Sequence, residues 1–151
     1  MTRRIAELLP VVLLLALTVP LSAQPGSNDE LRAKAEQGDV QAQYNLGIMY
    51  ETGRGGPQDD AEAVRWYRLA GDQGNPSGQL NLGLMYATGR GVPQDYVQAY
   101  MWLSLSASRS SGETRDSAAN SRDRAASRLT PDQRAEAQRL AREWDEAHPR
   151  D

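Results

Sequence analysis

The chain of 151 residues contains no cysteine, no phenylalanine and a single histidine. The missing cysteine excludes disulfide bonds, thiolate catalysis and cysteine-based metal sites, and it removes the acceptor that a bacterial lipoprotein anchor needs. The only histidine, His148, lies near the C-terminal end of the sequence. These absences remove many of the side chains on which enzyme chemistry depends.

Common catalytic motifs are also missing. A serine acylase of the penicillin-recognising type needs a serine three residues before a lysine, whereas Leu31 precedes the only lysine, Lys34, at this spacing. No H-E-x-x-H or G-x-S-x-G sequence occurs. The number of acidic residues leaves two-carboxylate hydrolysis open, but no acidic pair lies outside a helix cap or a charged helix face. We therefore expect a non-catalytic protein with no metal ion and no cofactor.

The formal net charge is −3, which argues against nucleic acid as a partner because nucleic-acid binding needs a basic surface. Without phenylalanine, the core must be built from Ala, Leu, Met, Tyr and Trp, a set that favours closely packed helices. We expect one all-α domain.

Residues 1–23 have the pattern of a secretory signal peptide. Arg3 and Arg4 precede an uncharged apolar run, and small residues lead to a predicted cleavage after Ala23. An uncleaved anchor is the alternative, but the run is shorter than the roughly 20 residues that span a bilayer. We expect a periplasmic or secreted protein with no stable membrane anchor after cleavage, and a flexible lead-in over residues 24–28.

One stretch of sequence occurs twice. N-L-G-I-M-Y-E-T-G-R-G-G-P-Q-D at 45–59 returns as N-L-G-L-M-Y-A-T-G-R-G-V-P-Q-D at 81–95, identical at 12 of 15 positions. A fixed offset of 36 residues is typical of stacked helical repeats, in which one unit buries its apolar face against the next. The predicted fold is a short α/α superhelical solenoid of helix-loop-helix repeats.

Asp39 is a suitable N-cap for the first helix of the repeat, and Gly53 is a suitable end. Gly47 lies inside that helix, which predicts close approach of another helix backbone. Arg54 and Arg90 lie in the glycine-rich loops. We expect both to bond loop or neighbouring-helix carbonyls, with a ligand role as the alternative.

Asp59 and Asp95 open the second helices, with Glu62 and Gln98 three residues later, and we predict two capping boxes. The acidic residues near Asp59 are explained by capping and the helix dipole rather than by a metal ion. In the next turn Asn75 is the predicted cap, with proline after it.

The repeated sequence resembles the Sel-one-like repeat (SLR) family, a relative of the tetratricopeptide repeats. The first copy reads A-Q-Y-N-L-G-I-M-Y-E-T-G-R-G at 42–55, then P-Q-D, A-x-x-W-Y and A-G-D-Q-G. The second copy departs at Leu103, where an aromatic residue is usual, and at Ser106, where alanine is usual. The resemblance implies an adaptor in protein–protein interaction. Some cysteine-rich relatives act on β-lactams, so the alternative function is a weak hydrolase or binder of cell-wall or β-lactam ligands.

The predicted organisation has four parts followed by a tail. They are a half-repeat at 29–38, repeat one at 39–74, repeat two at 75–110, a C-terminal half-repeat and capping helix at 113–147, and a frayed tail at 148–151. The serine-rich stretch from Ser104 to Gly112 loses the pattern, and Thr130 starts the last helix with a capping box. We expect Trp144 to seal the stack.

The candidate binding surface lies opposite the buried stripe of each first helix, on the concave side of the stack. It comprises Gln41, Tyr44, Asn45 and Ile48 in repeat one and Ser77, Leu80, Asn81 and Leu84 in repeat two. Amides beside apolar side chains suit an extended peptide, so the predicted partner is a protein or peptide. A second interpretation stays open, in which both asparagines bond a neighbouring helix and Ile48 and Leu84 belong to the core between repeats. Homo-oligomerisation also stays open.

Overall fold

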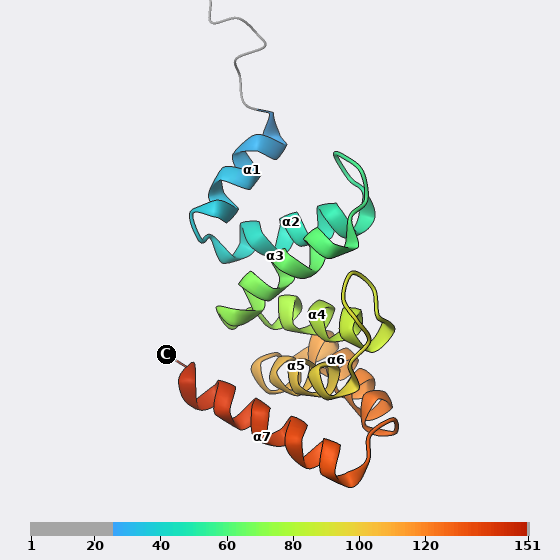
Figure 1. The fold of residues 1–151 in the computed structure, drawn as a ribbon. Coiled ribbons are helices and arrows are strands. Elements are labelled where there is room, and N and C mark those ends of the chain that lie inside the picture. Colours follow the sequence, from blue (N-terminus) through green and yellow to red (C-terminus); the bar gives the residue numbers. More distant parts are fainter. Residues whose placement is uncertain (1–25, 151) are drawn as a thin grey trace, which may run out of the picture.

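A computed structural model of the protein describes residues 26–150, which form seven α-helices and no strand (Figure 1). The helices are α1 (Ser27–Glu36), α2 (Val40–Thr52), α3 (Asp60–Asp72), α4 (Pro76–Thr88), α5 (Tyr96–Arg109), α6 (Gly112–Ala126) and α7 (Pro131–Ala147). Within 26–150 no helix combines the length and the apolar character needed to cross a bilayer. The predicted signal peptide, residues 1–23, lies outside the described residues. The predicted lead-in was too long, because Ser27 and Asn28 belong to α1.

The first helices of the two repeats, α2 and α4, begin and end in the same way. Asp39 accepts a hydrogen bond from the backbone N–H of Ala42 (2.7 Å), and Asn75 accepts one from that of Gly78 (2.7 Å). At their C-terminal ends Gly53 and Gly89 adopt left-handed φ angles of 72° and 69°. The predicted caps and glycine ends are confirmed, because each depends on residues within one helical turn.

The second helices, α3 and α5, also start at the predicted caps, Asp59 and Asp95. The two predicted capping boxes are wrong. The backbone N–H of Asp59 donates to the Tyr50 carbonyl (2.9 Å), and that of Asp95 donates to the Tyr86 carbonyl (3.0 Å). These bonds hold each loop against the end of the preceding helix, so no side chain is needed to satisfy the two cap N–H groups.

Gly47 makes room for a side chain and not for a helix backbone, which corrects the prediction. A Cβ atom at Gly47 would lie 2.5 Å from the ring of Tyr67, which is fully buried. At the equivalent Gly83 a Cβ atom would lie 2.7 Å from Leu103. The backbone approach occurs instead at Gly78, where a Cβ atom would lie 3.2 Å from the Gly71 nitrogen.

Two equivalent glutamines connect successive units of the stack. Gln79 is fully buried and donates to the Gly71 carbonyl (3.0 Å), while Gln43 is buried and donates to the Ala35 carbonyl (3.1 Å). Each carbonyl lies near the C-terminal end of the preceding helix and also accepts from a backbone N–H, so the glutamine adds a second hydrogen bond to it. The half-repeat formed by α1 is therefore joined to α2 in the same way as α3 is joined to α4.

The C-terminal part departs from the repeat geometry. The serine-rich stretch does not interrupt α5, which continues to Arg109 with Leu105 and Ser106 buried. Helix α6 packs on α5 and on α4, and α7 packs across α5 (Figure 1). The buried side of α6 consists of the small residues Ala118, Ser121 and Ala125, which allow it to lie close to its neighbours.

Trp144 connects α7 to α5. Its ring meets that of Trp102 edge-on at 6.1 Å, and the Arg109 guanidinium lies 4.6 Å from its centre. The expectation of a frayed tail is wrong for residues 148–150. His148 stacks on Trp144 at 4.0 Å and its carbonyl accepts from Arg109 (2.7 Å), while Arg150 donates to the Ser108 carbonyl (3.0 Å).

Candidate functional site

The eight predicted site residues lie along α2 and α4. Gln41 is exposed, and the other seven are half-buried. The four large apolar side chains among them pack against the core with one side and face solvent with the other: Tyr44, Ile48, Leu80 and Leu84. Ile48 and Leu84 therefore contribute to packing, as the second interpretation expects, and the assignment of these residues to a binding surface stays a prediction.

The two asparagines have different surroundings. Asn45 accepts a hydrogen bond from Gln41 on its own helix (3.0 Å). Asn81 lines a cavity of about 250 Å³, together with Leu84, Thr88 and Glu51 at the end of α2. Its side chain is also a hydrogen-bond partner of the Tyr67 hydroxyl on the neighbouring helix α3. Of the two equivalent amides, the one in repeat two therefore lies at a cavity and also bonds a neighbouring helix, as the second interpretation expects.

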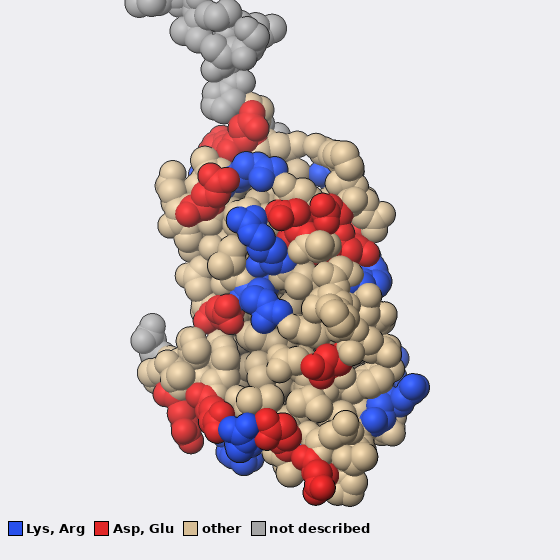
Figure 2. Space-filling model, in the orientation of Figure 1, with Lys and Arg blue, Asp and Glu red and all other residues tan. Residues whose placement is uncertain are grey.

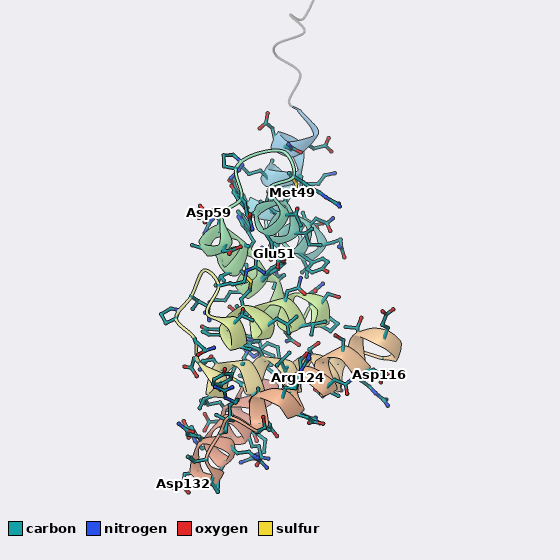
Figure 3. The ribbon with its side chains drawn as sticks, turned by 90° about the vertical axis from the view of Figure 1, so that its right-hand side faces the viewer. Met49, Glu51, Asp59, Asp116, Arg124 and Asp132 are labelled. Atoms are coloured by element: carbon teal, nitrogen blue, oxygen red, sulfur yellow. The ribbon has the colours of Figure 1, made fainter. Side chains whose placement is uncertain are left out.

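A second cavity, of about 420 Å³, adjoins the first on α4. The two cavities share the lining residues Leu84 and Thr88, and we call the pair of cavities the trough. Helix α4 contributes residues to both cavities, and Figure 3 shows Glu51 and Arg124 on opposite sides of that helix. The lining residues are Glu51, Asn81, Leu84, Met85, Ala87, Thr88, Arg90, Tyr96, Ser121, Arg124, Ala125, Ser127 and Arg128.

The α2 end of the trough contains a closed set of polar contacts. The buried Tyr67 hydroxyl donates to Glu51 Oε2 (2.5 Å), and Arg90 Nη1 donates to Glu51 Oε1 (3.1 Å). Burial and the neighbouring Glu51 carboxylate raise the pKa of Tyr67 above its ordinary value, so the phenol stays protonated and keeps donating. The charge of Glu51 is therefore already compensated within the protein.

Arg90 bonds carboxylates and not carbonyls, which corrects the sequence-based expectation. Its Nη2 lies 2.8 Å from Asp60 Oδ1 and its Nε lies 3.2 Å from Asp60 Oδ2, in addition to the Glu51 contact. Both acids belong to repeat one, so Arg90 ties the second loop to the preceding unit. The Asp60 carboxylate near Asp59 thus has a structural partner.

Arg54, the equivalent arginine of repeat one, is exposed and forms no salt bridge within residues 26–150. It lines a separate cavity of about 430 Å³ between α1 and the first loop, with Met49 and Tyr50. That cavity borders Gly26, the first described residue.

The α6 end of the trough carries two arginines that the sequence-based prediction missed. Arg124 donates to Ser121 Oγ (3.0 Å), and the Arg128 guanidinium lies over the Tyr96 ring at 5.1 Å. A signal for them exists in the sequence. The alanine stripe containing Ala118 and Ala125 marks the packed side of α6. Arg124 lies next to this stripe in the sequence, and Arg128 follows directly after the end of the helix.

The trough offers an amide, hydroxyls, apolar side chains and two guanidinium groups, which are binding groups. Within residues 26–150 no group of three or more His, Asp or Glu side chains is arranged to hold a metal ion. Acidic and basic side chains are intermixed over the face of the stack seen in Figure 2. The chemistry that this arrangement supports is recognition of a polar and apolar ligand.

Comparison with known proteins identifies the repeat. The Sel1 repeat family matches residues 40–75 and 76–111. An SLR-fold protective antigen of uropathogenic Escherichia coli superposes with a TM-score of 0.74 and 30% identity, covering 80% of this chain and 25% of its own. A Sel1 repeat protein from Oxalobacter formigenes gives a TM-score of 0.54 and 41% identity, covering 57% and 25%. The chain thus spans about a quarter of each solved relative. No curated protein matches the chain significantly.

Proposed function

Because this chain carries two Sel1 repeats on an SLR-type fold, we propose that it is an adaptor that binds an extended segment of a partner protein in the trough. Sel1 repeats generally mediate protein–protein interaction. The observation that carries the proposal is the pair of adjoining cavities on α4, which share Leu84 and Thr88 in their lining.

The lining of the trough matches the needs of an extended peptide. The Asn81 amide can donate to and accept from a peptide backbone, whose polar groups need partners when they leave water. Leu84 and Ala87 supply apolar surface for the side chains of the same peptide. A ligand held by these two kinds of contact needs no chemical step, which favours an adaptor over a hydrolase.

The test uses a phage-displayed random peptide library, selected on the purified protein and followed by affinity measurements on synthetic peptides. We expect the double variant Asn45→Ala/Asn81→Ala to bind selected peptides about tenfold more weakly, the loss expected when a buried peptide group has no partner. Its thermal unfolding should stay close to that of the original protein. Leu69→Ala, which trims an exposed side chain on α3, is the matched control and should bind normally.

Peptide binding that is unchanged by the double asparagine variant would overturn the assignment of the trough. Nitrocefin turnover by the same preparation tests the hydrolase hypothesis directly. Turnover that scales with protein concentration and survives further purification would replace the adaptor proposal with the enzymatic one.

We also propose that residues 1–23 direct export, leaving a mature chain that starts at Gln24. The basic pair Arg3-Arg4, the apolar run and the small residues before the cleavage point support this proposal. N-terminal sequencing of the protein from a periplasmic fraction should start at Gln24. An intact N-terminus in the membrane fraction would favour an uncleaved anchor instead.

A further inference from the structure

The α6 side of the trough differs from the rest of its lining in charge. The cavity of about 420 Å³ is lined by two arginines, Arg124 and Arg128, and by no carboxylate. Neither arginine forms a salt bridge within the described part of the chain, whereas Arg90 at the other end of the trough does. Both side chains are exposed, and two unneutralised positive charges that line one cavity favour an anionic ligand group.

Both guanidinium groups are held in place by contacts that leave their charge uncompensated. Arg124 donates to a serine hydroxyl, Ser121 Oγ (3.0 Å), and the guanidinium carbon of Arg128 lies over the Tyr96 ring, 5.1 Å from its centre. These neutral partners orient the side chains and reduce the entropy lost when a ligand binds. The planar fork of arginine matches a carboxylate with two parallel hydrogen bonds.

The neighbouring surface sets the context of that carboxylate. Leu84, Ala87 and Ala125 line the same cavity and provide an apolar wall beside the arginines. At the opposite end of the trough the arginine, Arg90, is already bound to Glu51 and Asp60, so it offers no free charge. The positive end of the trough is therefore the α6 end alone.

We propose that the trough is selective for a peptide in which an Asp or Glu side chain, bound by Arg124 and Arg128, lies next to an apolar side chain. This inference rests on the proposed function and adds the chemistry of the partner. Helix α6 lies outside the segments 40–75 and 76–111 that match the repeat family, so this selectivity does not follow from the matched repeats themselves. The net charge of −3 argues against a nucleic acid as the anionic ligand.

The experiment uses peptides from the same phage selection, synthesised with each Asp or Glu and again with the matching Asn or Gln. Fluorescence polarisation measures both versions against the original protein and against Arg124→Gln/Arg128→Gln. We expect the acidic version to bind the original protein about tenfold better than its amide version, and the double variant to lose that preference. Adding salt should weaken only the acidic version.

The control variant, Arg115→Gln/Arg142→Gln, removes two exposed arginines elsewhere and changes the net charge by the same amount. It should keep the preference for the acidic peptide. The inference is overturned if the original protein binds acidic and amide peptides equally, or if the Arg124/Arg128 and Arg115/Arg142 double variants lose the acidic preference to the same extent. In either case, binding that still depends on Asn81 preserves the proposed function. If no selected peptide depends on Asn81, both fail. Tighter binding of a labelled single-stranded oligonucleotide than of any acidic peptide would also overturn the inference.

Discussion

The loops of the two repeats have nearly the same sequence, yet their two arginines, Arg54 and Arg90, form different contacts. Arg90 joins Asp60 and Glu51 of the preceding repeat, whereas Arg54 is exposed and forms no salt bridge within the described residues. An arginine in this loop thus takes its structural role from the unit before it.

The helix glycines show a second difference between the repeats. Gly47 accommodates the flat ring of Tyr67, and Gly83 accommodates the branched side chain of Leu103. Tyr67 also reaches Glu51 with its hydroxyl, a contact that a leucine cannot make. Repeat one therefore couples its core packing to the polar contacts at the start of the trough, and repeat two has only the packing.

Replacing Tyr67, which couples the core packing to these polar contacts, should have the largest effect on stability. We expect Tyr67→Ala to lower the free energy of unfolding by about 3–5 kcal/mol, because a fully buried aromatic ring is removed and a cavity remains. Urea unfolding followed by circular dichroism measures the change. Tyr44→Ala, which removes a half-buried ring packed 6.0 Å from that of Tyr67, should cost less. Equal losses in the two variants would contradict the burial difference.

The comparison of Gly47 with Gly83 predicts an intermediate effect on stability. Gly47→Ala should destabilise the protein by about 1–3 kcal/mol through overpacking against a rigid ring, and Gly83→Ala should cost less because Leu103 can change rotamer. Differential scanning calorimetry gives the order of the melting temperatures. Gly56→Ala, where a Cβ atom would meet nothing within 4 Å, should change stability by no more than about 0.5 kcal/mol. A reversed order of Gly47→Ala and Gly83→Ala would show that the ring moves more easily than the leucine.

The smallest effect is expected at the loop arginines. Arg90→Gln should lower stability by about 0.5–1 kcal/mol, since its ion pairs are partly exposed, and Arg54→Gln should have almost no effect. Chemical unfolding at low and high salt measures both, and the difference between the variants should shrink as salt screens the pairs. If Arg54→Gln were as destabilising as Arg90→Gln, the contrast between the two loops would fail.

Much of the fold was predictable because its signals are local or repeated. The caps at Asp39, Asn75 and Thr130 and the helix ends at Gly53 and Gly89 each depend on a few adjacent residues, and all were predicted. The capping boxes at Asp59 and Asp95 were wrong because the backbone carbonyls of Tyr50 and Tyr86 compete for the same N–H groups. That competition depends on how the loop folds back and not on the spacing of residue types.

The candidate site was only half predictable. Asn81 and Leu84 follow from the helical periodicity of α4, and both line the trough. Arg124 and Arg128 were missed because their relation to α4 depends on where a helix about 40 residues further along the chain packs. Asn45 was assigned the same role as Asn81 from the repeat, but its amide is bonded to Gln41.

The repeated sequence alone establishes an all-α stack of helix-loop-helix units, because caps, glycines and apolar spacing act over one or two helical turns. Contacts between units far apart in sequence decide which surface becomes the trough. They also decide that Arg90 forms salt bridges while the equivalent Arg54 forms none within the described residues. The small side chains of Ala118 and Ala125 let α6 lie against α4 and α5, and that packing brings Arg124 and Arg128 beside Leu84. The selectivity that we propose therefore depends on the segment where the repeat ends and α6 begins.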